Sequence, residues 1–464
     1  MKYLLLPILL LLLTLMNSCQ KDRILTSKDA LLYLSEDTLH FDTVFTTTGS
    51  TTQYFKIFNP NSQKLILSNI RLMGGNGSVF KVNIDGVPGS NFDEVEIAAG
   101  DSIYGFVTTV INPNSQDLPF VVRDSLQITF NGNKRLLQLE AYGKNAYFLR
   151  NKTITKDTTW SKKLPIVILG QLKVNEAVTL TIEKGTRIYT NALAPIQIHG
   201  TLRALGEKQD SNRILFTGDR LDEPYKNYPG SWPGIYFNKT SNNNILSYCI
   251  IKNAYQGVIC LQEASNALPK LTLQECVFDN IYDVAIGAGK SSITARNCLI
   301  SNSGYGAYLT AGGNYSFLHC TFAGIGNNYV AHKNATFTAT NADADGNTDA
   351  LSCTLDNCIV YGEGGTVDNE LVVSKKGSNP FLVAVNNTLY KNKNANNLIG
   401  FTNSINNQLP QFTTIDVTKR IFDFRLEATS PCINTGNSTY AITTDLDGNP
   451  RPVGIPDMGC YEMP

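Results

Sequence analysis

The sequence carries no net charge and little charge of either sign. Its 464 residues include 39 basic and 39 acidic side chains, and charged residues make up 17% of the total. A protein that binds nucleic acid through its phosphates needs a basic excess, so this balance excludes an electrostatic nucleic-acid binder. Methionine is scarce, and no long window shows apolar residues at helical spacing. We therefore expect an all-β protein.

Histidine is also scarce, and cysteine lacks the spacing of a metal site. The chain has four His residues, and no CxxC pair with a matching second pair occurs among its ten Cys residues. Zinc therefore has poor support. Calcium is the metal that a motif does suggest, because Asp343, Asp345, Asn347 and Asp349 place oxygen ligands at alternate positions. The same residues also suit a plain polar turn, since the Gly and Glu positions of a full calcium loop are not filled.

Long apolar runs are lacking except at the start of the chain. Residues 4–16 are too few to span a bilayer of about 30 Å, which needs roughly 20 residues. They are typical of a secretory signal, which we place at residues 1–18. The Ser18-Cys19 end resembles a bacterial lipobox, and this resemblance implies cleavage before Cys19 and acylation of that residue. The alternative is an ordinary signal with an incidental Cys.

The residues after Cys19 bear on the location of the protein. Residues 20–23 partly resemble the Lys-plus-acidic tag that sends some Gram-negative lipoproteins to the outer face of the outer membrane. A solvated linker over residues 19–30 is the alternative. No second apolar segment of spanning length follows. We therefore expect a lipid-anchored protein of the Gram-negative outer membrane, displayed at the cell surface.

Residues 31–145 contain short alternating runs between turns. The runs include 54–58, 64–72, 103–111 and 125–130, and Asn-Pro-Asn-Ser turns begin at Asn59 and Asn112. About seven short strands over about 110 residues is typical of an immunoglobulin-like sandwich. With phrases such as Phe41-Asp42-Thr43-Val44, the order also resembles a bacterial Ig-like family related to the ASPM/SPD-2/hydin domain. This region has no Cys, so it lacks the usual disulfide between the sheets.

Five cysteines in the second half of the chain occupy the same slot of the same short phrase. They are separated by 27, 22, 22 and 38 residues, and each is followed by β-forming residues and then Asn or Gly. A period near 22 of this kind is a coil repeat, in which no coil buries its apolar side alone. Stacked coils pair as parallel strands about 4.8 Å apart, so equivalent residues should form ladders. The ladder cysteines are Cys249, Cys276, Cys298, Cys320 and Cys358, and the ladder asparagines are Asn253, Asn280 and Asn302.

Each ladder has a structural interpretation. We interpret the cysteines as small, buried filler rather than a redox or metal stack, because neighbouring parallel strands rarely give disulfide geometry. Asn tolerates a left-handed bend, and its amide can bond the Asn above and below. Cys432 and Cys460 lie outside the ladder and are the best disulfide candidates.

Strand-turn-strand phrases at 178–188 and 196–206, together with the cysteine coils, resemble the pectin-lyase-like right-handed parallel β-helix family over residues 150–464. Phrases at 430–436, 445–452 and 457–462 look like the closing segment of many secreted bacterial β-helix proteins. The resemblance implies a fold and not a particular activity. The predicted architecture is therefore all-β, with an N-terminal Ig-like β-sandwich followed by a right-handed parallel β-helix, a solenoid.

Catalytic patterns of β-helix lyases and polygalacturonases do not stand out in this chain. We find no clustered Asp pair with Gly-His-Gly downstream and no closely spaced basic pair within a coil. The loop 218–232 instead carries Tyr225, Tyr228 and Trp232 beside charged groups. Flat aromatic faces next to charges suit a sugar. A loop pinned to the coil by its own aromatic residues is the alternative.

These observations favour a non-catalytic surface lipoprotein that binds or adheres. It would present a β-helix face to a polysaccharide or to another cell-surface component, with no nucleic-acid partner and no firmly assigned cofactor. One alternative is a polysaccharide lyase or glycoside hydrolase of β-helix type, since a solenoid can align catalytic residues from distant coils. The other is a structural or assembly component of the cell envelope.

Overall fold

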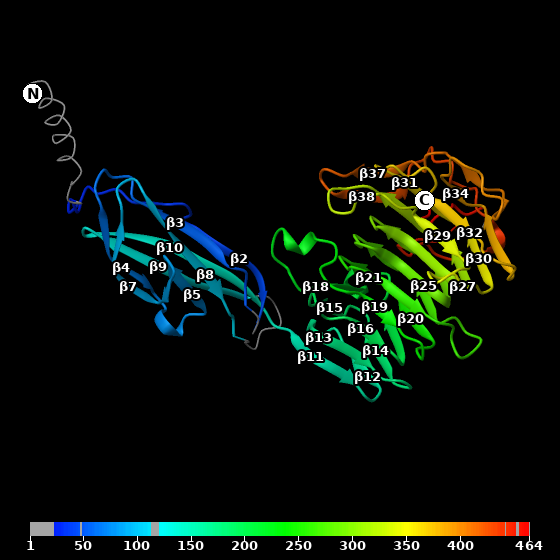
Figure 1. The fold of residues 1–464 in the computed structure, drawn as a ribbon, viewed down its shortest axis with the longest axis horizontal. Helices are drawn as coiled ribbons and strands as arrows, with labels where there is room; N and C mark the ends of the chain where they lie inside the picture. The colour runs from blue at the N-terminus through cyan, green and yellow to red at the C-terminus, as the bar shows by residue number, and fades with distance from the viewer. Residues whose placement is uncertain (1–22, 47–48, 113–119, 441, 452–453, 464) are drawn as a thin grey trace, which may run out of the picture. The chain divides into compact units, whose positions relative to one another are not determined.

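The computed structural model describes residues 23–46, 49–112, 120–440, 442–451 and 454–463. The chain divides into two compact units between Asn145 and Ala146. Both units are built from strands, as the sequence predicts (Figure 1). In the part of the chain that is described, no helix has the length and apolar character needed to cross a bilayer. The signal segment and Cys19 lie outside the described residues.

The first unit is a sandwich of two five-stranded sheets. Alternate residues of each strand point between the sheets; in β3 (Gln53–Phe58), for example, Phe55 and Ile57 are fully buried. Leu126 and Leu137 from the second sheet join the same core. One sheet contains β1 (Tyr33–Leu34), β3, β8 (Ser102–Thr109), β5 (Phe80–Ile84) and β6 (Val87–Gly89); the other contains β2 (Thr38–Phe45), β10 (Asn133–Lys144), β9 (Phe120–Phe130), β4 (Leu65–Leu72) and β7 (Asn91–Ile97), and the 3-10 turn η1 (Gly75–Gly77) lies between β4 and β5.

The second unit is a parallel β-helix, in agreement with the prediction. Strands of one coil pair in parallel with the equivalent strands of the next coil, as β18 pairs with β21 and β21 with β24. Most coils contribute three strands, one to each of three faces. The long strands β25 and β27 run through a corner and serve two faces each. The inward residues of all three faces form one apolar column along the inside of the coils.

Two long strands, β11 (Tyr147–Ile154) and β13 (Ile166–Val174), pair with each other at the start of the β-helix, and β13 continues into the second face through β15 and into the third through β16. The first face contains β12 (Thr158–Trp160), β14 (Thr179–Glu183), β17 (Thr201–Leu205), β20 (Asn244–Ser247), β23 (Leu271–Gln274), β25 (Val284–Arg296), β27 (Tyr305–Leu318), β30 (Leu351–Asp356), β33 (Phe381–Asn386) and β35 (Gly400–Thr402). The second contains β15 (Arg187–Thr190), β18 (Ile214–Gly218), β21 (Cys249–Lys252), β24 (Val277–Asp279), β26 (Leu299–Ser301), β28 (Thr321–Ile325), β31 (Ile359–Glu363), β34 (Leu389–Tyr390) and β36 (Ile405–Asn406). The third contains β16 (Ile196–Ile198), β19 (Ile235–Phe237), β22 (Val258–Leu261), the first parts of β25 and β27, β29 (Phe337–Thr340) and β32 (Leu371–Ser374). Outside the faces are the hairpin β37 (Phe412–Asp416) and β38 (Ile421–Leu426) and the 3-10 turns η2 (Asp210–Asn212), η3 (Tyr225–Asn227) and η4 (Ser438–Tyr440).

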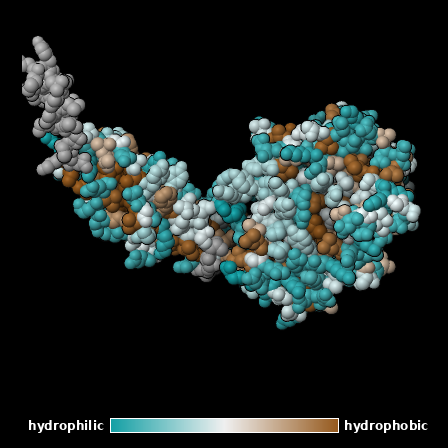
Figure 2. Space-filling view, in the orientation of Figure 1, coloured by the Kyte–Doolittle hydropathy of each residue, from teal (hydrophilic) through white to brown (hydrophobic). Residues whose placement is uncertain are grey.

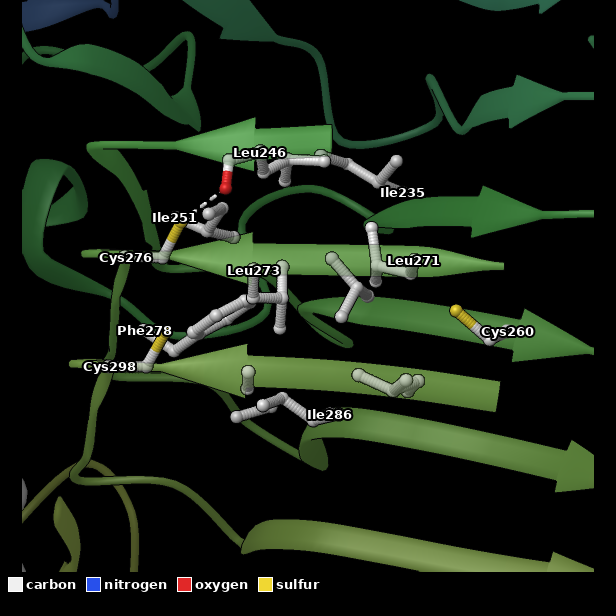
Figure 3. Close-up of a cluster of buried hydrophobic side chains, with 14 of the residues drawn as sticks. Ile235, Leu246, Ile251, Cys260, Leu271, Leu273, Cys276, Phe278, Ile286 and Cys298 are labelled. Atoms are coloured by element: carbon white, nitrogen blue, oxygen red, sulfur yellow. Dashed lines mark hydrogen bonds between the residues drawn. The ribbon is translucent and has the colours of Figure 1, made fainter. Parts of the chain in front are cut away.

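The five ladder cysteines stand at the start of successive second-face strands. The register pairs Val277 with Leu299 and Leu299 with Thr321, so the cysteines that precede these residues fall in line. All five are fully buried and free. Figure 3 shows Cys276 and Cys298 one above the other, among the apolar side chains of the interior.

The ladder continues beyond the cysteines in a way that the sequence pattern did not reveal. Thr388 and Ser404 precede the next two strands in the same register. The Cys276 thiol lies 3.3 Å from the Gln274 carbonyl oxygen, two residues earlier. The Thr388 hydroxyl makes the equivalent bond, 2.9 Å long, to the carbonyl two residues before it, and Ser404 makes one of 3.1 Å. The slot therefore requires a small side chain that can donate to its own strand, and sulfur is one way to meet that requirement.

The asparagine corner has the left-handed backbone that the sequence predicts. Asn253, Asn280 and Asn302 have φ of 61°, 57° and 50°. The Asn280 amide donates to the Asn253 side-chain oxygen at 2.8 Å, whereas the Asn302 amide donates to Asp279 at 2.7 Å. The amide ladder is therefore continuous over two coils and then changes partner. A second left-handed corner, which we did not predict, lies directly before the cysteines at Tyr248, Glu275, Asn297, His319 and Asn357.

This second corner holds the end of the chain against the side of the β-helix. The Asn297 amide donates to the Thr444 carbonyl at 2.7 Å, and the Asn357 side-chain oxygen accepts from the Asn437 backbone N–H at 2.7 Å. Arg451 is buried, pairs with Glu462, and donates to the Asn297 side chain at 3.1 Å. The closing segment is therefore a lateral clasp over several coils.

The expected disulfide between Cys432 and Cys460 is not present in the described residues, where both thiols are free and buried. They belong to separate apolar clusters under the clasp. Cys432 packs in the cluster that contains Leu389, and Cys460 packs in the one that contains Leu299. The two sulfurs therefore fill two different gaps between the clasp and the second face.

Candidate functional site

The aromatic loop after β18 does not present all three of its predicted ligand-binding residues. Trp232 is 0% exposed, and its indole N–H donates to the Lys252 carbonyl at 2.9 Å. The ring belongs to the central core of the β-helix. Its assignment to a sugar site is therefore wrong, and the alternative of a loop pinned by its own aromatic residue holds for Trp232.

Tyr225 and Tyr228 are exposed, by 43% and 37%, and they meet a third ring from elsewhere in the chain. The ring centres of Tyr225 and Tyr228 are 5.4 Å apart, and those of Tyr228 and Tyr329 are also 5.4 Å apart. A guanidinium lies over each end of this series, Arg220 at 4.0 Å from the Tyr225 ring centre and Arg420 at 4.2 Å from that of Tyr329. We call these five residues the tyrosine row.

The asparagine corner positions the tyrosine row. The Asn253 amide donates to the Lys226 carbonyl at 2.8 Å, and the Asn280 amide donates to the Asn227 carbonyl at 2.9 Å. Both carbonyls lie in the short turn η3, between the two tyrosines. The internal repeat of the β-helix thus fixes the backbone of an excursion that does not itself repeat.

A second group of exposed rings lies beside the loop. Tyr255 and Tyr282 occupy equivalent corners of successive coils and stack with ring centres 5.4 Å apart. Gly230 connects the two groups, because a side chain at that position would meet Tyr282 and Tyr255 at 3.6–3.9 Å. Asp283 follows Tyr282 and accepts from the Gln256 amide at 2.8 Å. Carboxylate and amide groups next to exposed rings can hydrogen-bond the hydroxyls of a ligand whose apolar face rests on the rings.

The acidic residues of the loop differ in burial and pairing. Burial raises the pKa of Asp219, whose carboxylate accepts from the Asn191 amide at 2.9 Å. Asp222 instead binds Arg220 through two hydrogen bonds of 2.7 and 2.6 Å. These bonds raise the pKa of the Arg220 guanidinium. The charge of Arg220 is thus neutralised within the loop.

The candidate calcium residues do not form a calcium site. The two oxygens of Asp343 accept from the backbone and side-chain N–H groups of Asn347, at 2.7 and 2.9 Å, and Asp349 pairs with Lys290. These bonds close an ordinary polar turn and leave the oxygens pointed at protein donors. No group of His, Cys, Asp and Glu within the described ranges could hold a metal ion.

The cysteine ladder also lacks the properties of a reactive site. All nine thiols of the described chain are buried. Burial raises the pKa of the ladder thiols Cys249, Cys298 and Cys358, whereas in Cys276 and Cys320 hydrogen bonds from the neighbouring thiols outweigh burial and lower the pKa. None of the five side chains contacts solvent, so no external electrophile or metal ion reaches them in the folded protein, and burial rather than pKa makes the ladder unreactive.

Comparisons with known proteins give no family. No family model matches the sequence, and no curated protein matches it. A protein of unknown function from Porphyromonas gingivalis W83 is similar to this chain at 13% identity and a TM-score of 0.19, over 27% of this chain and 50% of that one. A family 123 glycoside hydrolase from Clostridium perfringens is similar at 11% identity and a TM-score of 0.18, over 24% and 23% of the two chains.

The catalytic unit of a GH87 α-1,3-glucanase from Streptomyces thermodiastaticus strain HF3-3 is similar over more of the chain. The similar region spans 76% of this chain and 89% of the glucanase unit, at 10% identity and a TM-score of 0.21. This chain spans half or less of the length of the first two structures. At these identities and TM-scores none of the three carries an argument about function.

Two residues of the tyrosine row could not be recognised in the sequence. Tyr329 and Arg420 lie about a hundred and two hundred positions from the loop, in a turn after β28 and in the turn before β38. No local motif marks either of them. The only hint in the sequence is that the spacing between equivalent cysteines varies. This variation predicts that loops leave the β-helix, but it does not predict which loops contact one another.

Proposed function

We propose that this protein is a lipid-anchored cell-surface protein of a Gram-negative bacterium that binds a polysaccharide through the tyrosine row. The observation that carries the proposal is the contact of three tyrosine rings from two distant segments, two of them exposed. The viewed face of the β-helix unit in Figure 2 is mainly hydrophilic, with apolar residues in separate patches. Ring faces stack on the C–H faces of sugars, and neighbouring charged groups bond the hydroxyls.

The rings are held in place before any ligand arrives. Arg220 and Arg420 each lie over one tyrosine, and Asn253 and Asn280 fix the backbone between Tyr225 and Tyr228. A side chain that is already ordered loses less conformational entropy on binding. This supports a binding role, because a loop that served only as a cover would gain nothing from exposed rings.

The test uses the soluble protein from Gln20 onward on a glycan array, followed by affinity measurements with any polysaccharide that it retains. One stacking contact contributes about 0.5–1.5 kcal/mol beyond area burial, and 1.4 kcal/mol corresponds to about tenfold in Kd. Tyr228→Ala should therefore weaken binding by about tenfold or less while the melting temperature stays unchanged. Retention of no glycan by the wild-type protein would defeat the proposal.

A rival aromatic surface provides the matched control. Tyr54, Tyr104 and Phe106 on β3 and β8 of the sandwich are exposed, with ring centres 6.1 and 6.0 Å apart. Tyr54→Ala removes the same type of side chain from the other unit and should leave binding unchanged. Loss of binding with Tyr54→Ala but not with Tyr228→Ala would move the site to the sandwich.

The lipid anchor is a separate part of the proposal. The apolar run that ends at Ser18-Cys19 supports acylation of Cys19. Metabolic labelling with a fatty-acid analogue should tag the wild-type protein and leave Cys19→Ala unlabelled. Equal labelling of both proteins would refute it.

A glycoside hydrolase is the second candidate, and one observation favours it. Asp219, one residue before Arg220, has a pKa raised by burial, which is the property of a general acid. Hydrolysis also needs a second, free carboxylate, and Arg220 already holds the neighbouring Asp222. Release of reducing ends from a bound polysaccharide, abolished by Asp219→Asn, would favour the enzyme over the binding protein.

A further inference from the structure

The two ends of the tyrosine row differ in charge. Arg220 is paired with Asp222 at one end. Arg420, at the other end, has no carboxylate partner in the described part of the chain. A guanidinium carries five N–H donors. The structure assigns one hydrogen bond from Arg420, a long bond of 3.4 Å to the Asn227 carbonyl.

Arg420 is nevertheless a well-positioned group. Its guanidinium lies 4.2 Å from the ring centre of Tyr329, and the Asn227 carbonyl that it contacts is also held by the Asn280 amide at 2.9 Å. Its neighbour Lys419 is much more exposed and pairs with Asp416 within the same turn. Asp416 therefore neutralises the charge of Lys419, whereas the charge of Arg420 has no acidic partner among the described residues.

We infer that the polysaccharide bound by the tyrosine row is anionic, and that Arg420 binds its carboxylate or sulfate groups. This inference rests on the proposed function. A planar guanidinium fork matches a carboxylate or a sulfate with two parallel N–H donors, and such charge-assisted bonds are stronger than bonds between neutral groups. The net charge of the chain is zero, so attraction by the protein as a whole would not select an anionic polymer.

The experiment uses the soluble protein from Gln20 onward on an array that carries neutral, uronic-acid-containing and sulfated glycans. Bound glycans should come from the anionic sets, and the set that dominates identifies carboxylate or sulfate as the group. Arg420→Gln should weaken binding to them by about tenfold or more. Lys419→Gln, which makes the same charge change one residue away, should weaken binding by less than about twofold.

Arg420→Lys keeps the charge but loses the planar fork, so its affinity should fall between those of the wild type and Arg420→Gln. Melting temperatures of the three variants check that the turn before β38 remains folded. If the wild-type protein binds neutral glycans as tightly as anionic ones and Arg420→Gln has no effect, the inference falls while the proposed function stands. If no glycan of any set binds, the proposed function falls as well.

Discussion

One measurement of stability on Trp232→Ala decides whether Trp232 belongs to the core or to the binding surface. Trp232 is fully buried. A buried aromatic residue removes about 150–250 Å² from water. At about 25 cal/mol per Å² this corresponds to about 4–6 kcal/mol, part of which Ala retains. We therefore expect Trp232→Ala to lower the free energy of unfolding by about 3–5 kcal/mol, a large share of a typical domain's stability.

Fluorescence offers a direct assay, because both tryptophans of the chain, Trp160 and Trp232, lie in the β-helix unit. Urea unfolding followed by tryptophan emission reports on that unit alone, and Trp160 still reports in the variant. Trp232→Phe is the control. It keeps most of the ring but loses the bond to the Lys252 carbonyl, and it should cost about 1–3 kcal/mol.

A single outcome would refute the reasoning. If Trp232→Ala unfolds within about 0.5 kcal/mol of the wild-type protein, the indole is not a core group. If that variant also loses polysaccharide binding, Trp232 faces a ligand, and the assignment of the surface to Tyr225 and Tyr228 would be incomplete.

Three further predictions concern the ladder and the clasp. Cys298→Ser should cost less than about 1 kcal/mol in urea unfolding, because Thr388 already places a hydroxyl in this slot, whereas Cys298→Leu should cost about 1–3 kcal/mol through overpacking. Burial lowers the pKa of His319 to about 3, below the ordinary value of 6.5. The stability that the folded protein gains from keeping His319 neutral is therefore fully present above pH 6.5 and is lost as the pH falls toward 3. His319→Asn should therefore lose less stability than the wild type between about pH 7 and about pH 4. Arg451→Met leaves Glu462 buried without its partner and should cost about 3–5 kcal/mol; if Arg451→Met/Glu462→Gln recovers none of this, the ion pair is not the cause.

The coil architecture could be predicted because its signal repeats. A slot that recurs near every 22 residues, such as that of Cys276 and Cys298, follows from parallel pairing of equivalent strands, and the structure keeps that register. The small size of the side chain decides the slot, so the continuation through Thr388 and Ser404 was invisible to a search for cysteine. A search for any small side chain at this position of the coil would have found the whole ladder.

The binding surface could be predicted only in part. Residue type does not report exposure, so Trp232 and Tyr228 looked alike in the sequence, although Trp232 is 0% exposed and Tyr228 is 37% exposed. Tyr329 and Arg420 reach the loop through tertiary folding and leave no local pattern. The prediction of calcium binding at Asp343 was wrong for a related reason, because oxygens at alternate positions can accept from the turn's own N–H groups as well as bind a cation.

The row of sulfurs has a consequence for how the protein must fold. If the chain is exported as proposed, it passes through an oxidising compartment where thiols in an unfolded chain are open to disulfide formation. Neighbouring ladder cysteines are 22–38 residues apart, so an unfolded chain can bring their thiols together before the coils close, although none is paired in the folded β-helix. Coil closure must therefore outpace oxidation. The refolding yield should depend on reductant that is present during folding. Reductant added after folding should not change the yield, because the closed coils keep the thiols away from solvent.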